Sequence, residues 1–216
     1  MSAAFDNSEH QNENYCVVLA SRPGVNNPPE DENFSCVICP MPAVENLGEE
    51  QVVVKTLYLS IDPALRCRMN EETGVEYITA WEVNKCISGL GGVGVVIHSR
   101  SQGLTTGDVV IKSDMFWPWQ RFSTMDASAL SKVEQKIAHT RPSLVLSLLG
   151  VSGITSFIGI RNRGHISPGK NQTVVITSAA GACGHLAGQF ENSDGPTNVV
   201  GNLRPHKEKC CKFDPR

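Results

Sequence analysis

The stretch TVVITSAAGACGHLAGQ, residues 173–189, has the residue types to bind a phosphate through its main chain. An apolar run ends in small residues, the turn Ala179-x-Gly181-x-x-Gly184 follows, and helix-forming residues come next. This is a variant of G-x-G-x-x-G with alanine in the first place. In that pattern one glycine lets the backbone approach a pyrophosphate, and the last lets the helix pack close to the strand. We expect the N–H groups of residues 181–184 to face the phosphates, since a helix N-terminus attracts anions. A tight turn that only packs helix on strand is the alternative.

The residues after a second strand distinguish NAD from NADPH. NAD-specific sites place Asp or Glu near the end of that strand to hold the ribose hydroxyl groups. Here a strand-like run at 199–201 is followed by Asn202 and then by the basic residues Arg204, Lys207 and Lys209. Positive charge without a carboxylate at the strand end favours the 2′-phosphate of NADPH. A solvated basic segment with no ligand is the alternative.

The chain before the glycine turn must position this chemistry, and its first part has the pattern of a β domain. Residues 15–131 are rich in short strand-like runs bounded by glycine and polar turns, such as QVVVKTLYLSID (51–62) and GGVGVVIHSR (91–100). Repeated β-branched runs of this kind predict a partly closed antiparallel barrel rather than a parallel sheet.

From residue 141 the pattern becomes that of an α/β domain. Residues 142–164 carry apolar side chains at helical intervals, with Ser143 as the start and Gly164 as the stop. NQTVVITS (171–178) then predicts a short strand that is buried on both faces. The sequence therefore predicts a disordered leader at 1–14, a β domain at 15–140 and an incomplete nucleotide-binding domain at 141–216.

Composition excludes several classes of protein. Of the 216 residues, 40% are hydrophobic and 19% are charged, which is ordinary for a globular protein with a sizeable core. The net charge of −3 gives no reason to expect nucleic acid or an anionic membrane as partner. No apolar run approaches the roughly 20 residues that span a bilayer. The N-terminal residues lack the pattern of a secretory signal, so we expect a cytoplasmic protein without membrane insertion.

The eight cysteines do not form a disulfide or metal-binding pattern. Cys36 and Cys39 have no second pair to complete a zinc site, because Cys210 and Cys211 are adjacent. A thioredoxin-like pair would open a helix, whereas FSCVICPMP (34–42) reads as extended. We expect reduced structural thiols and no metal.

Four blocks of the sequence resemble the zinc-independent medium-chain dehydrogenases/reductases. They are TLYLSIDPALRCRMNEETGVEYITAW (56–81), FWPWQ (116–120), LLGVSGITSFIGI (148–160) and VVITSAAGACGHLAGQ (174–189). SGLGGVG (88–94) stands where zinc-dependent relatives carry a GHE-type motif, which fits a metal-free reductase. The resemblance implies an α/β plus β fold, in which a GroES-like partly closed β-barrel precedes the start of a Rossmann dinucleotide-binding domain. It is greatest to family members that reduce 15-oxoprostaglandins.

The resemblance also implies a reaction and its site. NADPH would deliver hydride to the β-carbon of a lipid enone, and hydrogen-bond donors would stabilise the resulting enolate. It assigns substrate contacts to Met115 and Phe116 and the 2′-phosphate to Lys209, which is one residue out of register. It assigns the pyrophosphate to the turn residues Gly181, Ala182, Cys183 and Gly184.

Three aromatic residues are further candidates for this site. Tyr77 is our candidate for the catalytic hydroxyl donor near the enone, and a buried tyrosine that only packs is the alternative. Trp117 and Trp119 would line the lipid side of the pocket, or serve as plain core aromatics.

The sequence departs from the family in two places. The family's D-P-Y-M-R is DPALR at residues 62–66, so an aromatic side chain is missing near the cleft. After Gln189 the expected helix gives way to FENSDGPTN (190–198), whose residues are poor helix formers.

Two hypotheses for the function therefore remain. A dinucleotide domain of this kind has about six strands, so we expect the nucleotide half to be truncated, with an unpaired edge on the strand at 174–176. The first hypothesis is an NADPH-dependent reductase of 15-oxoprostaglandins, acting as a monomer or homodimer. The second is a catalytically inactive truncated fragment that acts, if at all, as a binding or pairing module.

Overall fold

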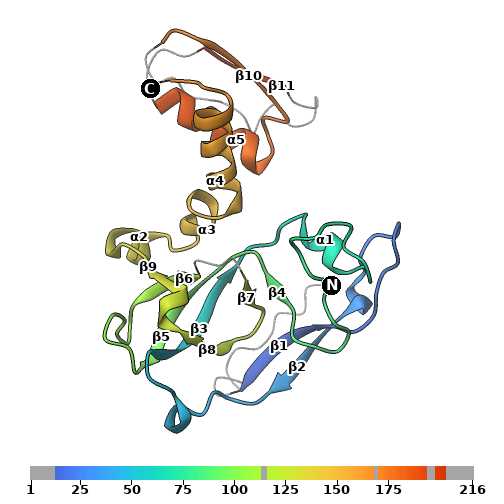
Figure 1. Cartoon of the computed structure of the whole chain (residues 1–216), viewed down its shortest axis with the longest axis vertical. Coiled ribbons are helices and arrows are strands. Elements are labelled where there is room, and N and C mark those ends of the chain that lie inside the picture. Colours follow the sequence, from blue (N-terminus) through green and yellow to red (C-terminus); the bar gives the residue numbers. More distant parts are fainter. Residues whose placement is uncertain (1–12, 113–115, 168–169, 194–197, 203–216) are drawn as a thin grey trace. The chain divides into compact units, whose positions relative to one another are not determined.

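The structure is a computed structural model that describes residues 13–112, 116–167, 170–193 and 198–202 (Figure 1). The chain divides into two compact units, residues 1–142 (unit 1) and 143–216 (unit 2). Each unit is described by itself.

Unit 1 is built mainly of strands. Its strands are β1 (Asn14–Leu19), β2 (Phe34–Cys39), β3 (Gln51–Leu59), β4 (Ser88–Gly89), β5 (Gly92–Ser99), β6 (Val109–Lys112), β7 (Trp117–Pro118), β8 (Phe122–Asp126) and β9 (Leu130–Lys132). Its helices are short: η1 (Asp31–Asn33), η2 (Val44–Asn46), α1 (Leu65–Arg68), η3 (Ala127–Ala129) and α2 (Gln135–Thr140).

The centre of unit 1 is a five-stranded antiparallel sheet in the order β8-β3-β5-β6-β9. The hairpin β1-β2 and the short pair β4-β7 are separate two-stranded sheets of the same unit. Val52 and Val54 of β3 are fully buried in a hydrophobic core that also contains Val110 and Trp117. Burial of one such side chain contributes about 1.5–3 kcal/mol. This antiparallel unit is the GroES-like part of the predicted fold.

Trp117 lies in the core of this sheet rather than on a pocket wall, which confirms the alternative of a plain core aromatic for this residue. Its side chain is 0% exposed, and its Nε1 donates to Thr56 Oγ1 at 3.1 Å. The ring packs so closely on Gly92 that a Cβ there would lie 2.3 Å from the ring. The glycine is therefore needed at that position because it alone leaves room for the indole.

Unit 2 begins with consecutive helical segments and continues as strand, helix and strand. The helical segments are α3 (Leu144–Leu148), α4 (Val151–Ile158) and η4 (Gly159–Arg163). The remaining elements are β10 (Thr173–Thr177), α5 (Ala182–Ser193) and β11 (Asn198–Asn202). Ser143 precedes the first helical turn and Gly164 follows the last, as predicted, although the helix is interrupted before Val151.

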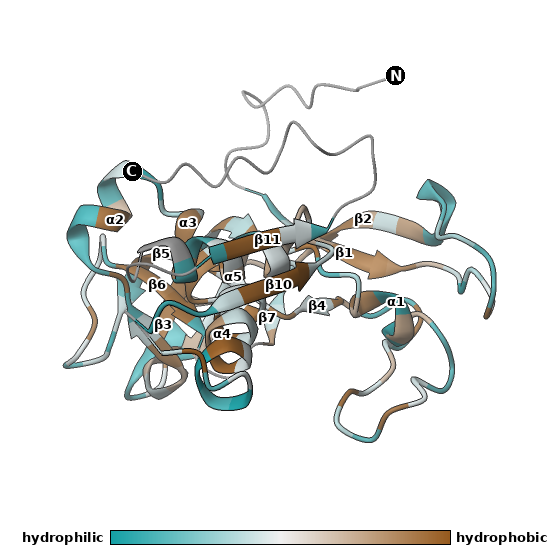
Figure 2. Cartoon of the chain, turned by 90° about the horizontal axis from the view of Figure 1, so that it is seen from above, coloured by the Kyte–Doolittle hydropathy of each residue, from teal (hydrophilic) through white to brown (hydrophobic). Residues whose placement is uncertain are grey.

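The strands β10 and β11 pair in parallel, as expected for the start of a Rossmann sheet. Both are apolar along much of their length (Figure 2). The prediction that the first strand is buried on both faces is wrong for the described residues. Val175 is 65% exposed, and within β10 Ile176 alone is buried. In the described part of the chain, β11 is the one strand paired with β10.

Helix α5 continues to Ser193 and so passes the point at which the sequence predicted its end. Tertiary contacts outweigh the weak helix propensity there. The Phe190 ring lies edge-on to Phe157 of α4, with the ring centroids 5.9 Å apart. The fully buried Glu191 forms an ion pair of 3.2 Å with Arg161 of η4.

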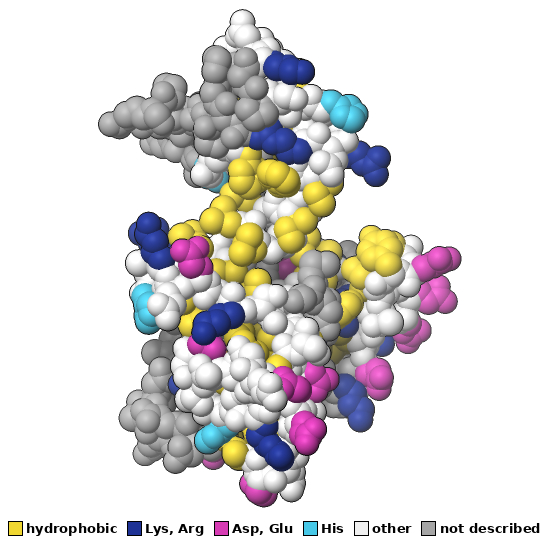
Figure 3. Space-filling view, turned by 60° about the vertical axis from the view of Figure 1, so that its left-hand side comes forward, with side chains coloured by type: hydrophobic (Ala, Val, Ile, Leu, Met, Phe, Trp, Pro, Cys, Tyr) yellow, Lys and Arg dark blue, Asp and Glu magenta, His cyan; other side chains and the backbone are white. Residues whose placement is uncertain are grey.

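The stretch Leu144–Arg163 is long and apolar enough to cross a membrane, by length and composition alone. This corrects the expectation that no run approaches that length. Only 22% of its most apolar window is buried. Hydrophobic side chains gather on the surface here (Figure 3), and the large exposed ones are Leu144, Leu148, Leu149, Ile154, Phe157 and Ile158. Length and composition are weak evidence for a membrane span, because the core helix of a soluble protein meets the same criterion.

Candidate functional site

The glycine turn joins β10 to α5 in unit 2. The Gly181 N–H donates to the Ser178 carbonyl at 2.8 Å, and Ser178 has φ of 53°, in the left-handed region. Gly184 lies against this bend. A Cβ there would lie 2.5 Å from the Ser178 oxygen and 2.9 Å from the Ala179 Cα. Helix α5 can therefore begin close to the strand because residue 184 has no side chain.

The N-terminus of α5 is open to solvent at this turn. Gly181, Ala182 and Cys183 are exposed, and Gly184 is half-buried. The first N–H groups of a helix have no intrahelical acceptor, and the helix dipole places partial positive charge there. The Gly181 N–H is used inside the turn, which corrects the expectation that four amides are available. The amides of residues 182–184 are the ones that can meet an anion.

The end of β11 reaches the same turn. The Ala179 N–H donates to the carbonyl of Asn202, the last residue of β11, at 3.2 Å. The basic residues Arg204, Lys207 and Lys209 lie outside the described residues. Their proposed contact with a 2′-phosphate stays a prediction.

In unit 1 a buried arginine joins two aromatic rings beside the predicted substrate position. Arg68 is 5% exposed, and its guanidinium carbon lies 5.3 Å from the Trp81 ring centroid and 5.5 Å from that of Phe116. Arg68 donates to the carbonyls of Thr79 and Ser88 at 3.0 and 2.7 Å. Burial lowers its pKa from the ordinary value, but a guanidinium stays charged at neutral pH. A cation thus lies against the partly exposed Phe116, and Met115 lies outside the described residues.

Two more arginines fix the loop that follows α1. Arg22 donates to the carbonyls of Met69, Asn70 and Trp81 at 2.8–2.9 Å. Arg66 donates to the Asn70 side chain at 2.9 Å and to carbonyls of the β1-β2 connection. With Arg68, these guanidinium groups hold both ends of the loop at 70–80. Sequence reasoning missed them, because partners that are main-chain carbonyls leave no signal in residue type.

Tyr77 lies in this anchored loop and is 80% exposed. The alternative of a buried, packing tyrosine is therefore wrong. Its hydroxyl has no hydrogen-bond partner among the described residues. Its role as a donor to an enone stays a prediction.

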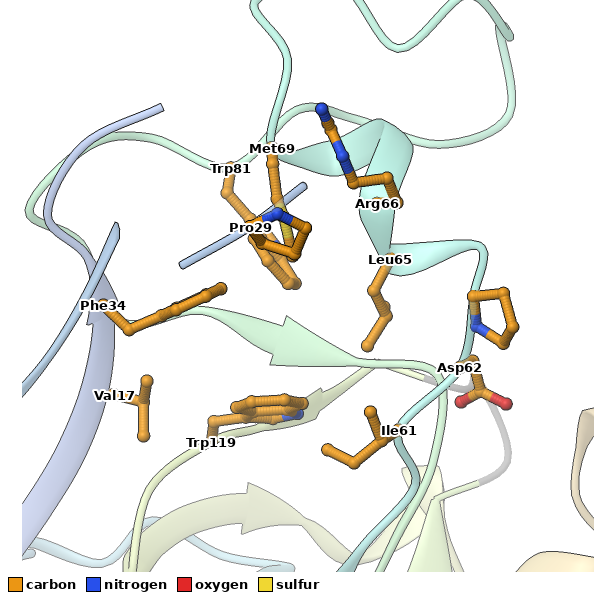
Figure 4. A pocket seen from close by; sticks show the side chains of 11 residues that line it. Val17, Pro29, Phe34, Ile61, Asp62, Leu65, Arg66, Met69, Trp81 and Trp119 are labelled. Atoms are coloured by element: carbon orange, nitrogen blue, oxygen red, sulfur yellow. The ribbon is translucent and has the colours of Figure 1, made fainter. Parts of the chain in front are cut away.

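A cavity of about 570 Å³ opens in unit 1 between α1 and the β1-β2 hairpin (Figure 4). Three aromatic rings line it: Phe34, Trp81 and Trp119. The centroids of the two tryptophan rings are 6.3 Å apart, and the ring planes are inclined at 58°. Trp119 thus lines a cavity, whereas Trp117, for which the same place was predicted, is in the sheet core.

In unit 1 the thiols of Cys39 and Cys86 both lie beside that of Cys16. Burial, and then the neighbouring Cys16 thiol, raise the pKa of Cys39 to about 11 and that of Cys86 to about 12. A raised pKa disfavours the thiolate, which is the nucleophile and the metal ligand. No cluster of three or more His, Cys, Asp or Glu within the described residues is arranged to hold a metal ion. The raised pKa values favour unreactive structural thiols.

Comparison with protein families identifies unit 1. Residues 16–133 match a family described as the N-terminal domain of oxidoreductase. The chain is 37% identical over 151 residues to the putative NADP-dependent oxidoreductase YfmJ of Bacillus subtilis. That alignment covers 70% of this chain and 41% of the relative. It is 34% identical over 159 residues to the NADP(+)-dependent 2-alkenal reductase of Nicotiana tabacum, covering 72% of this chain and 43% of the relative.

Comparison with solved structures covers both units. CurA from Vibrio vulnificus in complex with NADPH matches with a TM-score of 0.73 and 25% identity, over 93% of this chain and 55% of CurA. The chain thus has the fold of such oxidoreductases, a GroES-like unit followed by the start of a Rossmann domain. It spans about half the length of the proteins that it matches.

Proposed function

The chain belongs to the medium-chain dehydrogenase/reductase family, and we propose that its glycine turn binds the pyrophosphate of NADPH in a reductase of small conjugated carbonyl compounds. The observation that carries the proposal is the exposed N-terminus of α5, which Gly184 allows to begin directly against the bend at Ser178. The similarity to relatives named as NADP-dependent supports it.

The residues present fit the phosphate part of this cofactor. An anion at the turn meets the main-chain amides of residues 182–184 and the positive end of the helix dipole. The exposed side chains there are small, so the approach is open. When bound, NADPH supplies a hydride to the β-carbon of the conjugated double bond.

The substrate side of the proposal rests on unit 1. We propose that Phe116, held against the Arg68 cation, forms an apolar contact with the substrate. The exposed hydroxyl of Tyr77 is the proposed hydrogen-bond donor to the carbonyl oxygen, where negative charge develops during reduction. The class of substrate is that of the tobacco relative, a 2-alkenal reductase.

The finer proposal is that the substrate is a 15-oxoprostaglandin. The support for it is the sequence block from Arg66 to Trp81, whose ends the three arginines anchor. The test compares the rates of NADPH oxidation with a 15-oxoprostaglandin and with a short 2-alkenal. A higher kcat/KM for the short alkenal would contradict the prostaglandin proposal and leave the reductase proposal standing.

The phosphate site is tested by placing a negative charge on it. Cys183→Asp sets a carboxylate in the first turn of α5, where it repels a pyrophosphate but stabilises the helix through its dipole. We expect NADPH affinity, measured by nucleotide fluorescence, to fall about tenfold or more, equivalent to about 1.4 kcal/mol. Gln189→Asp, an equal change of charge at an exposed position of the same helix, is the matched control and keeps the affinity of the unchanged chain.

Two results would contradict the proposal. One is wild-type chain that binds no NADPH at millimolar nucleotide. The other is equal loss of affinity in both variants, which would show an effect of net charge rather than of the turn. Oxidation of NADPH at 340 nm with an enone then tests catalysis separately from binding.

The second candidate function is a pairing module without catalysis. The exposed apolar side chains Val175 and Val200 on β10 and β11 favour it. Absence of both NADPH binding and turnover, together with self-association in sedimentation, would favour this candidate over the reductase.

A further inference from the structure

The outer edge of β10 has no paired strand in the described part of the chain. β10 pairs with β11 on one side, and the two strands lie side by side (Figure 2). A free strand edge presents a row of main-chain N–H and C=O groups with which another strand can pair. The glycine turn begins after β10 ends, so the NADPH proposal does not use this edge.

One hydrogen bond indicates which residues of β10 face the free edge. The Asn198 N–H donates to the Gln172 carbonyl at 2.9 Å, so the main-chain groups of residue 172 point to β11. The main-chain groups of successive residues in a strand point to opposite sides, because each residue is turned over relative to the one before it. The residues whose N–H and C=O groups point to the free edge are therefore Thr173, Val175 and Thr177.

The sequence of β10 carries none of the features that protect a strand edge. Natural sheets block edge pairing with charged side chains, proline or a β-bulge. Residues 171–180 contain no charged residue and no proline, and the pairing with β11 runs without a register shift. Helix α5 packs against both strands, and Ile176 is buried. The side chains of the three edge-facing residues project from the other face of β10 and are exposed.

The sequence of β10 is self-complementary in the antiparallel direction. It reads TVVIT, which is nearly the same from either end. When Val175 lies opposite Val175 of a second copy, threonine lies opposite threonine and Val174 lies opposite Ile176. Cross-strand pairs of β-branched side chains are favourable, and no like charges meet in this arrangement.

The same register satisfies the main chain. In an antiparallel pair, opposite residues whose main-chain groups face the partner strand exchange both N–H···O=C bonds. Centring the pair on Val175 places each edge-facing residue opposite an edge-facing residue of the second copy. Every edge-facing N–H and C=O group of both strands then has a partner, whereas a shifted register leaves such groups unpaired at the ends of β10. The occupant that this edge fits is therefore a second copy of the chain.

We propose that two copies of this chain dimerise by antiparallel pairing of their β10 edges about a two-fold axis at Val175. The contact uses the same surface of both copies, so it closes after two chains. The amides of residues 182–184 take no part in it, and the dimer therefore does not depend on NADPH binding. The proposal goes beyond the pairing module considered above by naming the partner and the register.

The first test is sedimentation equilibrium of the full chain over a series of concentrations. We expect a reversible equilibrium between monomer and dimer that shifts to monomer on dilution, because a contact between strands of five residues is small. A chain that stays monomeric at millimolar concentration, or that forms species larger than a dimer, would overturn the proposal.

Two matched variants test the place of the contact. Val175→Lys sets two like charges directly opposite each other, so we expect the dissociation constant of the dimer to rise about fivefold. Val200 pairs with Val175 from β11 and is 50% exposed, so Val200→Lys adds the same charge one strand away from the edge. We expect Val200→Lys to keep the dissociation constant of the unchanged chain. An equal effect of both variants would place self-association on the face of the sheet and overturn edge pairing, while the pairing module would stand.

A pair of double variants tests the register. Thr173 and Thr177 are exposed, and the proposed register places each opposite the other in the second copy. Thr173→Lys with Thr177→Glu therefore brings opposite charges together, and we expect association at least as tight as that of the unchanged chain. Thr173→Lys with Thr177→Lys brings like charges together and should weaken association. Circular dichroism checks that each variant keeps the fold. Weaker association of both double variants would indicate parallel pairing and overturn the proposal.

Discussion

The strands β3 and β10 are similar in sequence and differ in their surroundings. Both carry consecutive valines, at Val52–Val54 and at Val174–Val175. The valines of β3 are fully buried in the hydrophobic core of unit 1, whereas Val175 of β10 is 65% exposed. Burial is therefore set by what covers the faces of a strand, because side chains project from the faces of a sheet and not toward the paired strands. Apolar sequence is necessary for it but not sufficient.

This difference predicts that the two units depend unequally on large side chains. Trp117→Ala in unit 1 removes a fully buried ring, so we expect a loss of about 3–5 kcal/mol in the free energy of unfolding. Phe157→Ala in unit 2 removes an exposed ring whose described aromatic partner is Phe190, so we expect about 1 kcal/mol.

Urea unfolding followed by circular dichroism measures both variants. Tryptophan emission adds a readout of unit 1 alone, because the three tryptophans of the chain lie before residue 143. Equal losses of unfolding free energy would show that the aromatic pair of unit 2 is as well packed as the core of unit 1. The predicted difference between the two units would then be wrong.

A matched substitution in the two strands sharpens the comparison. Val54→Thr places a hydroxyl in a fully buried position, and we expect a loss of about 1–3 kcal/mol. Val175→Thr places the same hydroxyl in an exposed position, where we expect a change within about 0.5 kcal/mol. Thermal unfolding measures both, and a large loss for Val175→Thr would show that β10 is covered in solution.

The smallest expected effect lies at the edge of the unit 1 sheet, where Lys132 of β9 contacts Asp108 at 2.6 Å. Burial alone would raise the pKa of Asp108, but hydrogen bonds from Lys132 and Thr105 outweigh it and lower this pKa below its ordinary value of 3.8. Lys132→Met should therefore cost about 0.2–1 kcal/mol at neutral pH.

The sign of its pH dependence follows from the lowered pKa. The contribution of Asp108 is complete above the unfolded pKa and is lost as the pH falls through the folded one. The difference in unfolding free energy between wild type and Lys132→Met should therefore shrink as the pH falls from about 5 through the unfolded pKa of 3.8 and below it. A difference that does not change with pH would assign the effect to the packing of the lysine stem instead.

Local patterns predicted much of the fold, and tertiary packing decided the rest. The strands of unit 1, the helix limits at Ser143 and Gly164, and the order strand, turn, helix around Gly184 follow from periodicity and turn residues. The length of α5 does not, because its last turn is held by contacts of Phe190 and Glu191 with residues 30 or more positions earlier.

The candidate site was predicted only in part, because contacts between residues far apart in the sequence decide its details. Sequence spacing located the glycine turn but did not show that the Gly181 N–H is used within it. The sequence analysis gave Trp117 and Trp119 the same place. In the structure Trp117 pairs in β7 and is fully buried, whereas Trp119 lines a cavity. The buried Arg68 was not found, because its carbonyl partners are main-chain atoms and leave no trace in residue type.

The arginines around α1 have a consequence for how the loop at 70–80 can change. Arg22 and Arg68 donate hydrogen bonds to main-chain carbonyl oxygens at the ends of this loop, and every amino acid supplies such an oxygen. Substitution of the side chains within the loop therefore leaves these hydrogen bonds in place. The loop can acquire new residues, and with them new ligand preferences, while the scaffold beneath it keeps its stability.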